Sequence, residues 1–137
     1  MLYVLHCRRW GIALDMAQQR WIIEFYETRN GRRPAEDFLE SLTDEEFVHV
    51  DRKLQRLEKY GRSLKPPDVK YLRDKIWELR ARCRRSRIRI LYFFYDGHKF
   101  VLSHGFRKKS GPVPDSEIDK AVAHRKDYLA QQMEKSR

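Results

Sequence analysis

The order of hydrophobic and polar positions divides the chain into short strands and amphipathic helices. Residues 21–26 (WIIEFY) are β-branched and aromatic, a composition that predicts a strand. Residues 34–41 begin with proline followed by acidic side chains, which is typical of the first turn of a helix. Residues 44–60 carry apolar side chains at three- and four-residue intervals, and Thr43 with Glu46 forms a capping box at their start. The first half therefore predicts a strand followed by two helices.

The second half predicts three strands and a last helix. Strands are expected over residues 76–80, 88–95 and 100–106, with Asp96-Gly97 as the turn between the last two. A helix is expected over residues 115–132. Because the strands are consecutive and the helices segregate, the fold class is α+β, an antiparallel sheet of about four strands packed against two N-terminal helices and a C-terminal helix.

The length of 137 residues predicts one domain, which we place at residues 19–137. Residues 1–18 are interpreted as an N-terminal extension of uncertain structure, in which residues 2–5 are a short edge strand or lie upstream of the main fold. Translation starts at Met1 or at Met16. The order of the early charges does not fit a secretory leader, and no apolar run is long enough to span a membrane, so a cytoplasmic protein is expected.

The distribution of charge along the chain indicates what the protein binds. The chain has a net charge of +10, and residues 61–110 alone hold 15 basic and 4 acidic side chains. Such a block attracts polyanions, namely nucleic acid, an acidic protein or an anionic membrane surface. A solubilising face is the alternative, although solubilising charge is usually dispersed with mixed signs.

No sequence motif points to a cofactor or a metal ion. Only two cysteines occur, Cys7 and Cys83, with no Cys-x-x-Cys spacing and no cysteine–histidine cluster in the sequence. Nucleotide-binding glycine loops and the HExxH pattern are absent from the sequence as well. We therefore expect neither a zinc site nor a cofactor, and a surface that acts through its cations alone.

The basic residues of the central block lie on or beside the predicted strands. On strand 88–95, alternation places Arg87, Arg89 and Leu91 on one face and Ile88, Ile90 and Tyr92 on the other. Candidate RNA-binding residues are Lys70, Arg73 and Lys75 before the first of these strands, Arg82, Arg84 and Arg85 in the following turn, and Arg87. Candidate catalytic residues are Arg80, Arg89, Arg107, Lys108, Lys109 and His104.

These residue types suit cleavage of RNA, whose 2′-hydroxyl is a nucleophile already present in the substrate. Arginine stays protonated and would clamp a phosphate, whereas a lysine among like charges has a lowered pKa and can exchange a proton. Lys75, Lys108, Lys109 and His104 are the candidates for proton transfer. Structural alternatives remain open: an ion pair for Arg80 with Glu78, solvated loop charge for the two adjacent lysines, and a hydrogen-bonded core position for His104.

Several blocks of sequence resemble one known family. They are RRPAEDFLESL at 32–42, VKYLRDKIWELR at 69–80, RIRILYFFYDG at 87–97 and LSHGFRKKSGPVPDSEIDKA at 102–121. In this order the blocks resemble the HigB-like, phage-derived branch of the RelE/ParE superfamily of type II toxins. The resemblance runs from about residue 21 to 128. It implies a RelE-like fold and a toxin that inhibits translation by cutting mRNA, usually on the ribosome and without a metal ion.

The resemblance also implies residue roles and partners. The family's basic functional positions correspond to Arg80, Arg89 and Arg107 with Lys108-Lys109, and loosely to Lys70 and Lys75. Arg80 and Arg89 would clamp the scissile phosphate, and Arg107 would stabilise the transition state. His124 and Tyr128 are the candidates for a C-terminal acid. The implied partners are mRNA, the ribosome and a HigA-like helix-turn-helix antitoxin, through which alone DNA would be bound. The rival hypothesis is a non-catalytic protein of the same fold, either a gyrase inhibitor or an RNA-binding module.

Overall fold

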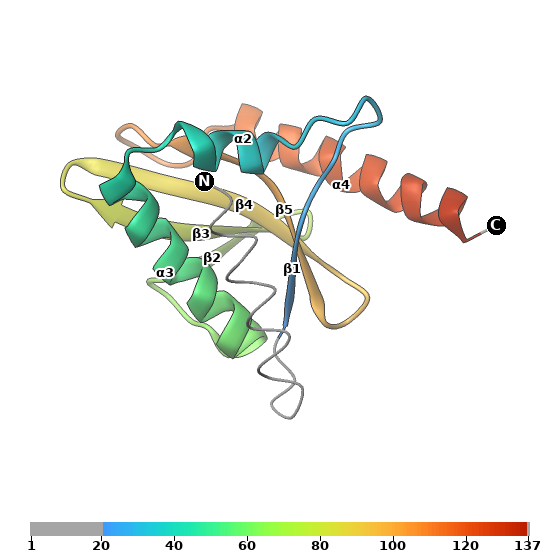
Figure 1. Cartoon of the computed structure of the whole chain (residues 1–137), viewed down its shortest axis with the longest axis horizontal. Helices are drawn as coiled ribbons and strands as arrows, with labels where there is room; N and C mark the ends of the chain where they lie inside the picture. Colours follow the sequence, from blue (N-terminus) through green and yellow to red (C-terminus); the bar gives the residue numbers. More distant parts are fainter. Residues whose placement is uncertain (1–20, 137) are drawn as a thin grey trace.

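A five-stranded sheet with helices on both faces makes up the protein (Figure 1). This computed structural model describes residues 21–136. The predictions for residues 1–18, including the strand over 2–5 and the choice between Met1 and Met16, lie outside the described residues. Among the described residues, no helix is both long and apolar enough to cross a bilayer.

The sheet confirms the α+β class and corrects the number of strands from about four to five. Its strands are β1 (Ile22–Phe25), β2 (Val69–Arg73), β3 (Ile76–Cys83), β4 (Ser86–Tyr95) and β5 (Lys99–Arg107). Their order is β1-β5-β4-β3-β2, with β1 parallel to β5 and every other pair antiparallel. This arrangement agrees with the RelE-like fold that the sequence resemblance implied.

The strand missed by sequence is β2, the edge strand opposite β1. It pairs with β3 through Val69–Leu79 and Lys70–Glu78. Sequence placed Lys70 and Arg73 before the strand at 76–80 and predicted no strand there, because an edge strand that exposes much of its surface does not show a clear apolar pattern. Strand β3 also continues to Cys83, so Arg82 lies on a strand, and only Arg84 and Arg85 form the turn to β4.

The helices begin as their sequences predict. They are α2 (Pro34–Ser41), α3 (Asp44–Tyr60) and α4 (Asp115–Lys135), with a single 3₁₀ turn at Gly61–Ser63 after α3. The capping box is present: the Thr43 side chain accepts a hydrogen bond from the Glu46 backbone N–H at 3.1 Å, and the Glu46 carboxylate accepts one from the Thr43 N–H at 3.0 Å. Sequence therefore located the helix starts, while α4 runs three residues further than predicted.

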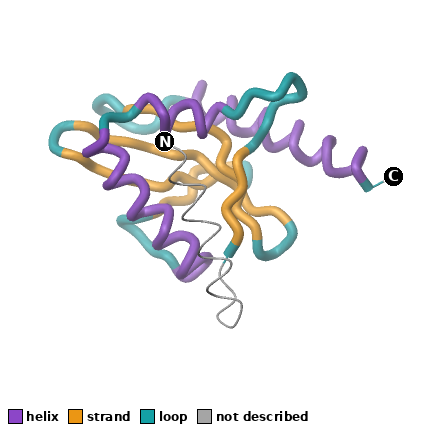
Figure 2. The backbone as a smooth tube through the Cα atoms, viewed as in Figure 1, coloured by secondary structure: helices purple, strands orange, loops and turns teal. Residues whose placement is uncertain are grey.

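Figure 2 shows the helices in purple and the strands of the sheet in orange. Two apolar layers of side chains hold these helices against the sheet. One packs α2 and α3 against Leu79, Ile90 and Leu102, and the other packs α4 against Leu91 and Phe93. The predicted alternation along β4 is thereby confirmed, with Leu91 on the α4 face and Ile88, Ile90 and Tyr92 on the opposite one. The α4 face also carries Arg87 and Arg89, which lie on β4 before the part that α4 covers.

A β-bulge in β5 changes which residues face which helix. Leu91 pairs with His104 but Tyr92 pairs with Leu102, so Ser103 is the extra residue. Beyond it, His104 faces α4, while Gly105 faces α2. A Cβ atom at Gly105 would lie 2.3 Å from the ring of Phe38, which explains why glycine is needed there. The bulge determines the position of Arg107 described below.

Candidate nucleic-acid interface

The α4 face of the sheet changes from apolar to charged where α4 no longer covers it. Leu91 and Phe93 of β4 lie in the layer beneath the helix. Further along the same face come Arg89 of β4 and, on the paired strand β3, Arg80 and Glu78. Alternation of side chains along each strand places these charges on one side of the sheet.

A buried glutamate organises two arginines of this face. The Glu78 side chain is 1% exposed, and its Oε1 accepts a hydrogen bond from Arg80 Nε at 2.7 Å. Its second oxygen lies 3.4 Å from Nε of Arg89, whose side chain is 11% exposed. One negative charge thus faces two positive charges, so the pair of arginines keeps an excess positive charge for an external anion.

Lys108 and Arg87 extend the cationic region beyond the arginine pair. The backbone N–H of Lys108 donates to the Arg87 carbonyl at 2.7 Å, which fixes the residue that follows β5 beside the start of β4. Loss of water contact, together with the charges of Arg89 and Arg87, lowers the pKa of the Lys108 ammonium below its usual value. We call Arg80, Arg87, Arg89 and Lys108 the basic cluster.

Two surface hollows border the basic cluster. The first, of about 360 Å³, lies between β2, β3 and the start of α4, and its lining includes Lys70, Glu78, Arg80 and Lys108. The second, of about 560 Å³, lies between β3, β4 and α3. Its charged lining residues are Arg52, Lys53, Arg80, Arg82, Arg87 and Arg89. Arg80 lines both hollows, so a continuous polyanion could contact both sides of it.

The structure therefore brings together about half of the candidate residues. Seven of them line the two hollows: Lys70, Arg73, Arg80, Arg82, Arg87, Arg89 and Lys108. The Arg73 guanidinium is also bound to Asp74 and Asp119 at 2.7 Å each, and Arg84 is bound to Glu45 at 2.9 Å. Lys75, Arg85 and Lys109 are exposed residues of turns and loops, and Arg107 and His104 are described next.

Arg107 does not lie with the basic cluster, which corrects the expected convergence. Its guanidinium donates to both oxygens of Glu46, from Nη2 at 2.7 Å and from Nε at 3.1 Å. Without the bulge at Ser103, regular alternation would place Arg107 on the α4 face; the extra residue turns it toward α2 and α3. Arg107 thereby lowers the pKa of the Glu46 carboxyl to about 2 and serves the start of α3.

His104 lies in a buried polar network beneath α4. This is the hydrogen-bonded core position that the sequence offered as the alternative to a catalytic role. Its Nε2 lies 2.9 Å from a Glu117 oxygen, and its Nδ1 lies 2.8 Å from the Ser103 hydroxyl, which also contacts His124. Burial lowers the pKa of His104 well below its usual value, although Glu117 opposes the shift. The ring is neutral at physiological pH and only 4% of the residue is exposed, so it does not reach the basic cluster.

Sequence reasoning missed two contributions to this surface. Arg52 and Lys53 come from α3, outside the charged block, and join it only because α3 packs against β3. Glu78 was considered as an ion-pair partner for Arg80 but not as a link between Arg80 and Arg89. The i, i+2 spacing of Glu78 and Arg80 placed them on one face, whereas the contact with Arg89 depends on the β3–β4 register.

The fold and this surface define a small α+β protein with a cluster of basic side chains on one face of its sheet. The chain belongs to the family described as phage-derived protein Gp49-like (DUF891), whose model matches residues 37–126, about two-thirds of its length. This family is associated with RelE- and HigB-like toxins. The match contains the whole basic cluster. A search of curated proteins found no match.

Proposed function

We propose that the protein is the HigB-like toxin of a type II toxin–antitoxin pair and inhibits translation by cutting mRNA on the ribosome without a metal ion. The observation that carries this proposal is the basic cluster, where two arginines share one buried glutamate next to a lysine with a lowered pKa. Membership of the Gp49-like family supports the toxin class.

The cluster supplies a phosphate clamp and a base for cleavage of RNA, and the 5′-oxygen that leaves would take its proton from water. Arg80 and Arg89 face Glu78 through their Nε atoms, and Nη1 of Arg89 donates to the Ile88 carbonyl at 3.2 Å, so the other terminal nitrogens are available to a ligand. Those nitrogens would bind the scissile phosphate and stabilise the charge that develops on its oxygens. The nucleophile is the 2′-hydroxyl of the RNA itself.

Proton transfer is assigned to Lys108. Its lowered pKa increases the fraction of neutral amine near pH 7, and a neutral amine can accept the 2′-hydroxyl proton. Lys109 follows it directly and is the second candidate for the same step. Arg107, which is bound to Glu46, and His104, which is buried, have no part in this proposal.

The proposed partners follow from the same assignment. The substrate is mRNA in the ribosomal decoding region, and a HigA-like helix-turn-helix antitoxin would block the toxin and link it to DNA. The protein is expected to act in the cytoplasm, where ribosomes are found. Toxicity that is abolished by co-expression of the neighbouring helix-turn-helix reading frame would support this pairing.

Primer extension on transcripts from expressing cells tests the proposal. New 5′ ends within translated codons are expected, and they should disappear in the variant Arg80→Gln, Arg89→Gln, Lys108→Gln. A control variant that loses the same charge on exposed positions elsewhere, Arg32→Gln, Lys65→Gln, Lys126→Gln, should keep them.

Three results would contradict the proposal. Growth inhibition that survives the triple substitution would exclude the basic cluster as the site. Ends that appear equally when translation is blocked would exclude ribosome dependence. DNA-damage signalling without new mRNA ends would favour the gyrase inhibitor.

A further inference from the structure

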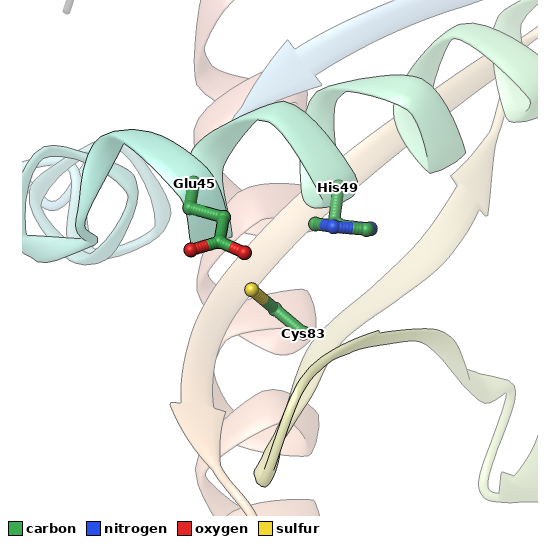
Figure 3. Close-up of side chains that lie close together, drawn as sticks. All are labelled: Glu45, His49 and Cys83. Atoms are coloured by element: carbon green, nitrogen blue, oxygen red, sulfur yellow. The ribbon is translucent and has the colours of Figure 1, made fainter.

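Three side chains with metal-binding groups meet where α3 packs against the end of β3. Figure 3 shows Glu45 and His49 on successive turns of α3, with Cys83 opposite them. A carboxylate oxygen, an imidazole nitrogen and the thiol sulfur all lie within 4.8 Å of one another. The spacing of four residues places Glu45 and His49 on one face of the helix, and the packing of α3 on β3 adds the cysteine.

We propose that Glu45, His49 and Cys83 bind one zinc ion. Thiolate, imidazole and carboxylate are the three ligand types that zinc takes from proteins, and the thiolate disfavours magnesium and calcium. Three protein ligands leave the fourth tetrahedral position to water or another small ligand. The proposal is independent of the proposed RNA cleavage.

The Glu45 carboxylate keeps one oxygen for a metal ion, although the nearby charges are balanced, since Arg84 binds Glu45 and Arg107 binds Glu46. Arg84 donates to Oε1 of Glu45 at 2.9 Å, so Oε2 is available to a metal ion. Burial and the charge of Glu45 raise the pKa of the Cys83 thiol, so zinc would have to displace the thiol proton on binding.

Exposure of the three residues allows a metal ion to enter from solvent. Glu45 is exposed and His49 is partly exposed, while Cys83 is 5% exposed. Binding would join the first turns of α3 to the residue that precedes the β3–β4 turn. His49 also lines the hollow that Arg80 and Arg82 line, so a bound zinc ion would link α3 to β3 at the edge of that hollow.

Binding of Zn²⁺ and of Co²⁺ to the purified full-length chain tests the proposal. We expect one equivalent of either metal and, with Co²⁺, the near-ultraviolet charge-transfer absorption of a thiolate ligand. Cys83→Ser should abolish that absorption and weaken Zn²⁺ binding by more than the roughly 10–100-fold that loss of an outer-shell partner costs. Glu45→Gln and His49→Ala should each weaken it as well.

Matched controls separate this site from other groups of the chain. Cys7→Ser removes the other cysteine, and Asp44→Asn removes an equal charge from the same helix turn; both should bind Zn²⁺ as the unmodified chain does. Because Glu45 is exposed, Glu45→Gln is expected to fold normally and covers the case in which Cys83→Ser does not. Zn²⁺ should raise the Tm of the unmodified chain and of both controls, but not that of Cys83→Ser.

The pH dependence of binding has a defined sign. The reaction replaces the Cys83 thiol proton with zinc and releases that proton, so the affinity should fall as the pH is lowered. Absence of stoichiometric binding at neutral pH would overturn the proposal. Binding that is lost in Cys7→Ser but kept in Cys83→Ser would overturn it as well.

Discussion

Two glutamate–arginine groups lie on opposite faces of the sheet, and they use their charges differently. On the α2–α3 face, Arg107 donates through two nitrogens to the two oxygens of Glu46, so one positive charge meets one negative charge. On the α4 face, Glu78 meets both Arg80 and Arg89 through their Nε atoms. The charges of the first group balance, whereas the second group has one more positive than negative charge and can attract an anion.

This difference separates structural from functional cations better than the number of charges does. Glu46 already belongs to the capping box of α3, so Arg107 completes a contact between helix and sheet. Glu78 belongs to no helix cap and lies under an uncovered part of the sheet. Unsatisfied atoms occur in the second group: Nε of Arg89 and one oxygen of Glu78 are buried without a hydrogen-bond partner among the described residues. These two atoms face each other at 3.4 Å as an ion pair, so the Arg89 contact is longer than the hydrogen bonds that Arg107 makes to Glu46.

The largest effect on stability is expected from Glu78→Gln. This change leaves Arg89, with a side chain 11% exposed, without a counter-charge, and breaking a buried pair in this way costs about 3–5 kcal/mol. Glu46→Gln should cost less, because the exposed Arg107 can be hydrated and glutamine can still cap the helix. Urea unfolding measures both, and equal losses for the two variants would contradict the distinction.

The rate of mRNA cleavage should depend on the arginines of the α4 face and not on Arg107 of the opposite face. Under the proposed function, Arg80→Gln should lower mRNA cleavage by about 100-fold or more, the usual cost of losing one preorganised charge-stabilising donor. Arg107→Gln should leave the cleavage rate unchanged while lowering the free energy of unfolding. Single-turnover cleavage by matched amounts of folded protein checks this, and a large loss of rate in Arg107→Gln would contradict it.

Sequence predicted the elements well but predicted the two faces only in part. Proline and acidic residues in the first turn located α2, and the capping box with the spacing of apolar residues located α3, because these are local patterns. Alternation along β4 also placed Arg87 and Arg89 correctly relative to Ile88 and Ile90. Edge strand β2 was missed because its pattern is weak, and Arg82 was assigned to a turn because the end of β3 is polar.

The site required information that only the folded chain contains. The position of Arg107 depends on one extra residue, Ser103, and no local pattern distinguishes a bulged strand from a regular one here. The contribution of Arg52 depends on how α3 packs on β3. For the same reason the sequence indicated no metal cluster: Glu45 and His49 show helical spacing, but Cys83 is distant in the chain.

A smaller effect on the free energy of unfolding is expected when acid protonates Glu46 and breaks its ion pair with Arg107. Arg107 holds the pKa of Glu46 at about 2, below its value of about 4.5 in the unfolded chain, so the stabilisation is fully present above pH 4.5 and is lost as the pH falls toward 2. Because Arg107 is 45% exposed and solvent screens the pair, we expect about 1 kcal/mol. Urea unfolding between pH 5 and 2 should show this loss in the unmodified chain and a weaker pH dependence in Glu46→Gln. An identical dependence in both would contradict it.

The smallest expected effect is on the salt dependence of RNA binding, and it tests how far the RNA-binding surface beside Arg80 and Arg89 extends along β3. Arg82 lines the larger hollow, whereas Arg85 lies in the exposed turn beyond it. Binding to a 2′-O-methyl RNA strand, which lacks the nucleophile, can be measured at several salt concentrations. Arg82→Gln should reduce the slope of log affinity against log salt by about 0.7, the value for one phosphate contact with a single strand, and Arg85→Gln should leave it unchanged. Equal changes in both variants would mean that general positive charge, and not the hollow beside Arg80 and Arg89, attracts the RNA.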